Sequence, residues 1–94
     1  MTTRGTSNKN TRGSSYDVRA RKQWLLDTFG DGTWADCSFC LLVLDFGTLT
    51  VDRIIPGCRG GTYRRDNIRP ACLSCNAIDG NTHRVQLQRE RATA

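Results

Sequence analysis

Five cysteines are the residues whose types and spacing most clearly indicate chemistry in this sequence. Four of them form two C-x-x-C pairs, Cys37 with Cys40 and Cys72 with Cys75. Two intervening residues let both sulfurs of a pair turn toward one ion, and two pairs supply a tetrahedral set of thiolates. The pattern predicts a structural Zn²⁺, because four thiolates leave no coordination position for water. Cys58 falls outside the pattern and is interpreted as a loop thiol without a role.

Length and composition limit what kind of domain this metal could support. The chain has 94 residues and a formal net charge of +5. This length allows one domain and excludes a large two-lobed enzyme. The apolar core of so small a domain is seldom stable alone, so a further stabilising element such as a bound metal is expected. The longest apolar run, residues 39–44, is far shorter than the roughly 20 residues that cross a bilayer. We therefore expect a cytoplasmic protein with no membrane association.

The positive charge is concentrated at the start of the chain. Residues 1–22 carry the whole net charge of +5, and the remaining residues are neutral on balance. Residues 1–15 are polar and basic, which predicts a disordered tail. Such a tail is either a solvated leader or an arm that binds phosphates. The sequence does not separate these two readings.

The elements that must position the cysteines are predicted from periodicity and turn signals. A helix is expected over residues 16–29, capped by Ser14 with Asp17 and ended by Gly30. Its apolar positions are expected to cap the core: Val18, Trp24, Leu25 and Phe29.

Two strands and a second helix are expected further along. Residues 41–45 and 49–55 are predicted to pair as a hairpin around Phe46 and Gly47. A short helix is predicted from about residue 66 to residue 78, ended by Gly80. The fold class is therefore α+β, with the zinc-stapled domain over residues 16–81 and a tail over residues 82–94 that is either partly helical or frayed.

The segment between the two cysteine pairs carries a more specific pattern. Its elements follow in order: Asp52, then Ile55-Pro56, Gly60-Gly61-Thr62, Asp66-Asn67-Ile68 and Cys72-x-x-Cys75-Asn76. Together they resemble the HNH endonuclease family, the ββα-metal fold, in its subgroup with two C-x-x-C zinc knuckles. The resemblance covers residues 34–80, and the length and basicity are similar to those of small HNH proteins carried by bacteriophages.

The resemblance implies a catalytic site as well as a fold. In the family a hairpin and a crossing helix hold one divalent ion against the scissile phosphate. By resemblance Asp52 and Asn76 ligate this ion (Mg²⁺, Mn²⁺, Ni²⁺ or Zn²⁺), and Asn67 braces the loop. The alternative readings are a solvated carboxylate for Asp52, a helix-capping amide for Asn76 and a helix N-cap for Asn67.

One position departs from the family pattern. The residue after the strand aspartate is normally the general-base histidine, and here it is Arg53. A guanidinium stays protonated at any working pH, so it cannot take a proton from water, although it can clamp a phosphate. The candidates for a replacement base are His83, Tyr63 and Asp66, or a hydroxide formed at the metal. His83, the single histidine, is otherwise read as a solvated surface residue.

Basic residues gather around this segment. They are expected either to neutralise nearby thiolates and carboxylates or to contact nucleic-acid phosphates, the second reading being favoured because arginine forks fit phosphate oxygens. The expected nucleic-acid residues are Arg53, Arg59, Tyr63, Arg64, Arg65 and Arg69.

The sequence therefore predicts a metal-dependent DNA endonuclease or nickase, with enzymatic activity left open by the missing histidine. The alternative is a catalytically impaired HNH-like zinc module that binds DNA or a protein partner. The partner expected first is DNA, held mostly through phosphates, and a phage packaging or host protein is the further candidate. Localisation would be the cytoplasm, that of the host if a phage encodes the protein.

Overall fold

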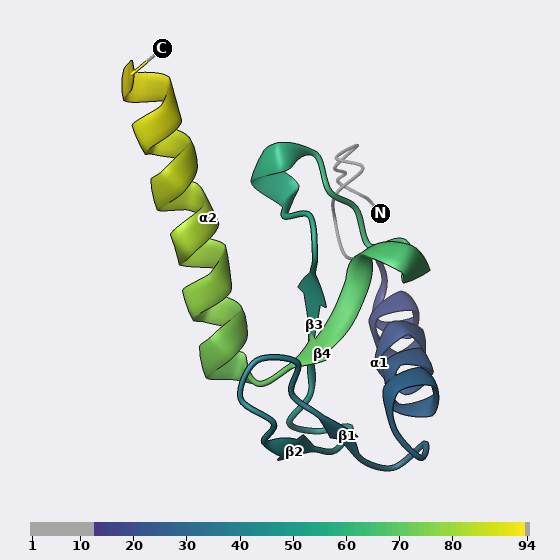
Figure 1. The fold of residues 1–94 in the computed structure, drawn as a ribbon. Coiled ribbons are helices and arrows are strands. Elements are labelled where there is room, and N and C mark those ends of the chain that lie inside the picture. The colour runs from purple at the N-terminus through teal and green to yellow at the C-terminus, as the bar shows by residue number, and fades with distance from the viewer. Residues whose placement is uncertain (1–12, 94) are drawn as a thin grey trace.

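The computed structural model describes residues 13–93, so most of the predicted basic tail over residues 1–15 lies outside the described residues. Two helices, four short strands and two 3₁₀ turns follow one another (Figure 1). In chain order they are α1 (Ser15–Phe29), β1 (Ala35–Asp36), β2 (Val43–Leu44), β3 (Thr50–Arg53), η1 (Gly57–Arg59), η2 (Arg65–Asn67), β4 (Ile68–Ala71) and α2 (Leu73–Thr93). The fold is α+β, as predicted, and its second half has the order β3, β4, α2.

Helix α1 confirms the helix predicted over residues 16–29. Its first turn is closed by a capping box, in which the Asp17 amide donates to Ser14 Oγ (3.2 Å) and the Ser14 amide donates to Asp17 Oδ2 (3.2 Å). The helix ends at Gly30, whose amide donates to the Leu26 carbonyl (3.1 Å). The predicted apolar stripe is partly wrong, because Leu26 is buried with Leu25 whereas Phe29 is half exposed to solvent.

The predicted hairpin between residues 41–45 and 49–55 is wrong. Strand β2 pairs with β1, and β3 pairs antiparallel with β4 so that Asp52 faces Arg69 across the ladder. The segment between β2 and β3 is a turn closed by Asp45 and Thr48, with the Thr48 amide donating to Asp45 Oδ1 (2.9 Å). Leu44 and Leu49 flank the turn and both lie in the core, so packing against the rest of the fold holds this segment instead of pairing across the turn.

The helix predicted over residues 66–78 is also wrong at both ends. Residues 68–71 form β4, and α2 begins only at Leu73. Pro70 is tolerated in β4 because a two-stranded ribbon leaves one edge of each strand unpaired. At the other end, α2 passes through Gly80 and continues to Thr93. A glycine inside a helix costs only about 1 kcal/mol relative to alanine, which does not end the helix here.

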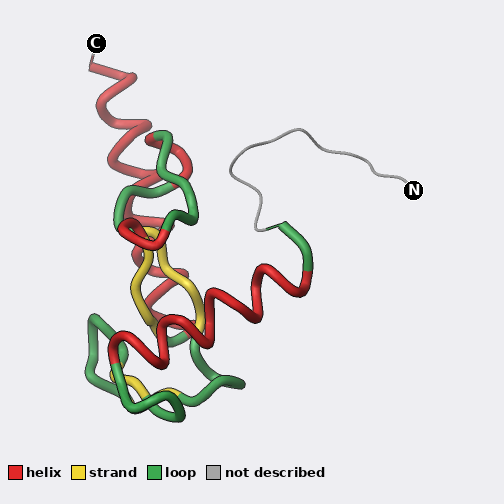
Figure 2. Tube along the Cα trace, turned by 90° about the vertical axis from the view of Figure 1, so that its right-hand side faces the viewer, coloured by secondary structure: helices red, strands yellow, loops and turns green. Residues whose placement is uncertain are grey.

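The two helices lie on opposite sides of the β3–β4 ribbon (Figure 1). Figure 2 looks across α1 onto the ribbon, whose two strands lie side by side, with the C-terminal half of α2 running past the ribbon beside the β3–β4 loop. Because side chains alternate along a strand, Thr50 and Asp52 face α2 whereas Val51 and Arg53 face α1. The core is small, and among the described residues its buried apolar members are Leu25, Leu26, Ala35, Cys37, Leu44, Leu49, Ile68 and Ala71.

The β3–β4 loop is held by Asn67. The Ile55 amide donates to Asn67 Oδ1 (2.8 Å), while Asn67 Nδ2 donates to the carbonyls of Ile55 (3.0 Å) and Thr62 (2.8 Å). The chain packs so closely here that a Cβ added to Gly61 would lie 1.6 Å from the Ile55 carbonyl oxygen. The loop therefore requires glycine at this position.

Replacing Gly61 by alanine should open this loop. We expect Gly61→Ala to lower the free energy of unfolding by at least about 2 kcal/mol, because the new Cβ displaces backbone rather than a flexible side chain. Thermal unfolding followed by circular dichroism measures the loss. Gly47→Ala is the matched control, since its Cβ would meet only Asp45 Oδ1 at an ordinary 3.5 Å. Equal melting temperatures for the two variants would contradict the close approach at Gly61.

Candidate metal centres and nuclease site

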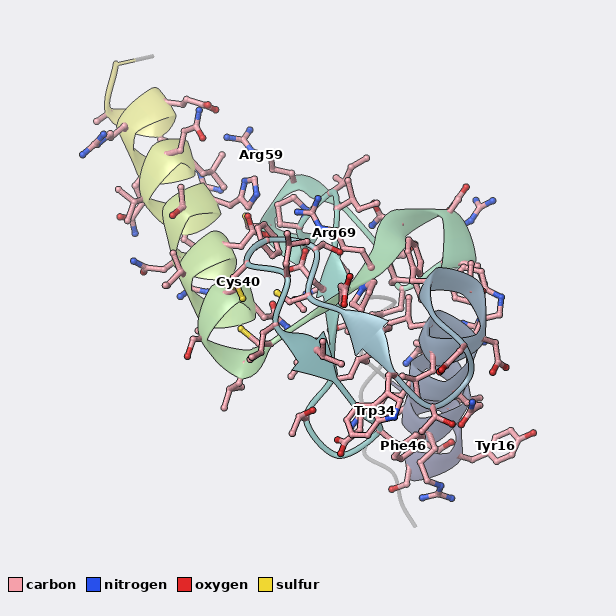
Figure 3. The ribbon with its side chains drawn as sticks, turned by 60° about the horizontal axis from the view of Figure 1, so that its bottom comes forward. Tyr16, Trp34, Cys40, Phe46, Arg59 and Arg69 are labelled. Atoms are coloured by element: carbon pink, nitrogen blue, oxygen red, sulfur yellow. The ribbon has the colours of Figure 1, made fainter. Side chains whose placement is uncertain are left out.

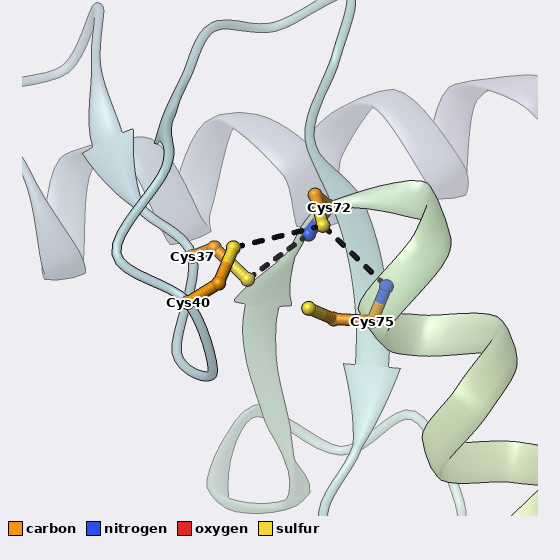
Figure 4. A group of neighbouring side chains, drawn as sticks. All are labelled: Cys37, Cys40, Cys72 and Cys75. Carbon is orange, nitrogen blue, oxygen red and sulfur yellow. Dashed lines mark hydrogen bonds between the residues drawn. The ribbon is translucent and has the colours of Figure 1, made fainter.

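Four cysteines meet where the β1–β2 loop reaches the start of α2 (Figure 4). Cys37 and Cys40 lie in the loop after β1, and Cys72 and Cys75 lie at the junction of β4 and α2. All four sulfurs lie within 4.8 Å of one another, and Cys40 Sγ and Cys72 Sγ are 4.0 Å apart. Tetrahedral Zn²⁺ with Zn–S bonds of about 2.3 Å puts sulfurs about 3.8 Å apart. The four residues therefore fit one zinc ion, as the sequence predicted.

The protein backbone already favours thiolate at one of these sulfurs. Burial would raise the pKa of Cys37, but backbone amides directed at its sulfur lower it to about 6. Two of these donors are the amides of Phe39 (3.5 Å) and Cys72 (3.3 Å). The pKa of Cys75 is instead raised to about 12, first by its contact with the Cys72 thiol and then by burial. Such crowding opposes full ionisation of the group without a cation, and Zn²⁺ supplies one.

The fifth cysteine takes no part in this centre. Cys58 lies in η1 with its side chain exposed, and it is not among the grouped sulfurs. Its interpretation as a loop thiol outside the zinc set agrees with this placement.

Asp52, on strand β3 between the two cysteine pairs, is a buried acid. Only 2% of its surface is exposed, and its Oδ2 accepts a hydrogen bond from Arg69 Nε at 2.8 Å. Burial raises the pKa of Asp52 to about 6, with a further upward contribution from the negative charge of Asp79, and the Arg69 contact opposes both. The side chain is thus a poorly solvated carboxylate beside a second carboxylate, which is the environment that functional acids commonly occupy.

Asn76 lies on the α2 face near the same strand. Its Nδ2 donates to Thr50 Oγ1 (3.0 Å) and to the Val51 carbonyl (3.4 Å). With the nitrogen directed at β3, the amide oxygen is the atom left to ligate a cation. Asp52 and Asn76 together offer oxygen donors from β3 and α2, which are the ligands that hard divalent ions prefer.

Asp79 is a residue that the sequence analysis missed. Its Oδ1 lies 3.2 Å from His83 Nε2, and its Oδ2 lies 3.8 Å from Arg69 Nη2. The spacing of Asn76, Asp79 and His83 is the three-and-four spacing of one helix face, and this signal was available in the sequence. A helix that ends at Gly80, as the sequence predicts, would separate His83 from Asp79, and only the continuation of α2 to Thr93 brings them together.

Arg53 lies on the other side of the ribbon from the Asp52 carboxylate. Its guanidinium carbon is 4.4 Å from the centre of the Tyr63 ring, and Arg21 approaches the same ring to 4.8 Å. Its Nη1 also donates to the Gly61 carbonyl at 3.4 Å. The structure therefore brings Asp52, Asp79 and His83 together on the α2 face and leaves Arg53 and Tyr63 on the α1 face.

The other expected nucleic-acid residues fall in different surroundings. Arg69 is engaged with Asp52 and lies over the Phe39 ring at 4.5 Å, whereas Arg59 reaches across to Glu90 on α2 at 2.9 Å (Figure 3). Arg64 is largely exposed, with Asp66 3.7 Å away, and Arg65 lies over the Trp24 ring at 5.6 Å. Arg59 and Arg69 thus each pair with a carboxylate, whereas the side chain of Arg64 is 79% exposed.

Residues 37–82 match the family model described as HNH endonuclease. The match begins at the first zinc ligand and ends inside α2, so it contains both cysteine pairs, Asp52 and Asn76. Residues 37–82 therefore form an HNH endonuclease domain, and the four grouped cysteines within it fit the form of this domain that carries a zinc knuckle. The family is one of nucleases, whose substrates are nucleic acids.

Neither the curated proteins nor the solved structures contain a significant match to the chain. Within the described residues, no helix has the length and apolar character needed to cross a membrane.

Removal of zinc should unfold the domain. The sulfurs tie the β1–β2 loop to α2, and the buried apolar core is too small to hold these elements alone. We expect a strong chelator, or Cys37→Ser, to abolish the cooperative thermal transition seen by circular dichroism. Cys58→Ser is the matched control and should melt like the wild type, because Cys58 lies outside the cluster. Full helicity in the metal-free protein would contradict the structural role.

Proposed function

We propose that this protein is an HNH-type endonuclease that hydrolyses DNA phosphodiester bonds with a divalent metal ion. The observation that carries the proposal is the buried Asp52 carboxylate, placed on β3 opposite α2 inside the segment that matches the family. A buried acid with a raised pKa lowers folding stability, and such acids cluster at functional sites; this one faces the helix that carries Asn76.

In the proposed site, Asp52 and Asn76 would hold the catalytic ion, the first through its carboxylate and the second through its amide oxygen. When bound, a divalent ion would polarise a phosphoryl oxygen and stabilise the leaving oxygen. Asn67 keeps the β3–β4 loop closed through its three side-chain hydrogen bonds, so that the strand carrying Asp52 ends in a rigid turn. Mg²⁺, Mn²⁺, Ni²⁺ and Zn²⁺ are the candidate ions.

The general base must come from a residue other than Arg53. A guanidinium does not accept protons, and Arg53 contacts Tyr63 on the α1 face. His83 lies on α2 beside Asp79, whose carboxylate in turn neighbours Arg69 and Asp52. We therefore assign the base to His83 and assign Arg53 to phosphate contact and to support of Tyr63.

A second candidate function is binding without cleavage. The Arg69 guanidinium already neutralises Asp52 at 2.8 Å, and the usual base position is occupied by arginine. In this alternative the domain holds DNA, or a phage packaging or host protein, on the same surface. In either case the protein would act in the cytoplasm, that of the host if a phage encodes it.

Cleavage of supercoiled plasmid tests the proposal directly. Zinc-loaded protein with Mg²⁺, Mn²⁺ or Ni²⁺ should produce nicked or linear DNA, and EDTA should prevent it. Asp52→Asn should remove this activity by a factor of at least about 10², because it deletes a charged ligand of the ion. Its melting temperature should equal or exceed that of the wild type, since the substitution removes a poorly solvated charge.

The same assay separates the two candidate functions. No product from the wild type under any metal, together with cleavage by Arg53→His, would favour a binding module built on a nuclease scaffold. Loss of folding in Asp52→Asn, seen as a lowered melting temperature, would contradict the functional reading of this carboxylate.

DNA affinity should depend on salt through the exposed arginines of the β3–β4 loop. The proposed contacts to phosphate predict that the logarithm of the affinity falls linearly with the logarithm of the salt concentration. Arg64→Ala should weaken binding and reduce the size of that slope by about 1. Fluorescence anisotropy with a labelled duplex measures both quantities. Arg91→Ala, which removes the same charge from the last turn of α2, is the control and should have the smaller effect. Equal effects would indicate a response to net charge alone.

A further inference from the structure

One face of α2 carries two ionisable residues that the zinc site does not use. Asp79 and His83 lie one helical turn apart, with Asp79 Oδ1 3.2 Å from His83 Nε2. Their side chains are 16% and 27% exposed, so both are partly withdrawn from solvent. Arg69 links this pair to Asp52, because its guanidinium lies 2.8 Å from Asp52 Oδ2 and 3.8 Å from Asp79 Oδ2.

We propose that Asp79 is a positioning residue that orients His83 to act as the general base of the nuclease. This inference rests on the proposed function, because it supplies the base that the reaction needs. It assigns a role to a residue that the family pattern did not single out.

The two oxygens of Asp79 have separate neighbours. Oδ1 faces His83 and Oδ2 faces the Arg69 guanidinium, so the carboxylate plane is held between α2 and β4. A carboxylate at Nε2 favours the tautomer in which Nε2 carries the proton and donates to it. The proton-accepting atom of the neutral ring is then Nδ1, held in one orientation by the Asp79 contact.

The proposed step is ordinary hydrolysis. A water oxygen forms a bond to phosphorus while the bond from phosphorus to the leaving 3′-oxygen breaks with its electron pair. The proton released by the water passes to His83 Nδ1, giving an imidazolium that Asp79 stabilises. The 3′-oxygen takes a proton from solvent, and His83 later returns its own proton to solvent.

A purely structural role explains Asp79 less well. Arg69 already has Asp52 as a closer partner at 2.8 Å, so Asp79 is not needed to neutralise it. An aspartate–histidine pair one turn apart on a helix surface adds little to helix stability. Asp79 also places a second carboxylate near Asp52, with Arg69 between the two. Two neighbouring carboxylates repel each other, and such pairs are common at functional sites. Their presence inside the HNH endonuclease domain favours a functional role for Asp79.

The test compares Asp79→Asn with Asp27→Asn in the zinc-loaded full chain. Asp27 is an exposed carboxylate on α1 whose Oδ1 accepts a hydrogen bond from Gln23, four residues away, at 2.9 Å. The two variants therefore remove the same charge from similar helical pairs. We expect Asp79→Asn to lower kcat for metal-dependent cleavage by about 10²-fold, within the range for general-base catalysis, with KM nearly unchanged. Asp27→Asn should leave both constants at their wild-type values.

Two further measurements separate positioning from folding. His83→Gln should lose as much kcat as Asp79→Asn, and the double variant should lose no more than His83→Gln alone, because the two residues act as one unit. The ring nitrogens of the single histidine are observed by ¹⁵N NMR. Wild-type protein should show the tautomer protonated at Nε2, and Asp79→Ala should shift it toward a mixture while the melting temperature stays within a few degrees.

Several results would overturn the inference. Unchanged kcat in Asp79→Asn, additive losses in the double variant, or a wild-type histidine protonated at Nδ1 would each show that Asp79 does not orient a base. Cleavage by the wild type that survives His83→Gln would leave the proposed function standing and remove only this inference. Absence of cleavage by the wild type under every metal would instead defeat the proposed function, and the inference with it.

Discussion

The convergence of four sulfurs at one point is the constraint on which the rest of the structure depends. Cys37 is buried in the core, and its cluster joins the β1–β2 loop to the first turn of α2. That junction sets the direction in which α2 leaves β4, and so decides which helix face meets β3. Asn76 and Asp79 reach the neighbourhood of Asp52 because of this geometry. A structural zinc can therefore organise a second site in which it takes no chemical part.

The β3–β4 ribbon separates two kinds of chemistry. Alternation along β3 sends Asp52 toward α2 and Arg53 toward α1, although the two residues are neighbours in sequence. On the α2 face lie carboxylates and the single histidine, and on the α1 face arginines stack on an aromatic ring. An arginine in the usual base position is accommodated because its guanidinium is turned away from the acid and held by Tyr63 and the Gly61 carbonyl.

On the α2 face, Arg69 is shared between two carboxylates. The Arg69 guanidinium contacts Asp52 closely and Asp79 at a longer distance, so one cation lies between two carboxylates. The net effect on Asp52 is still a raised pKa, since burial outweighs the arginine contact. In the proposed site, a bound cation would relieve the repulsion between these carboxylates.

Much of this protein was determined by local sequence alone. The zinc ligands follow from the two C-x-x-C pairs, α1 from its capping box and Gly30, and the family from the ordered motifs between Asp52 and Asn76. The strand pairing and the length of α2 were decided by tertiary structure. Local turn signals at Phe46 and Gly47 indicate a hairpin, but β2 pairs with β1 and β3 pairs with β4, while Leu44 and Leu49 beside the turn pack into the core. Gly80 suggested a helix end, but its small local cost did not stop a helix that packs along β3 and η1. The approach of Asp79 and His83 to Asp52 depends on that continued helix, because contacts between distant segments arise only when the whole fold closes.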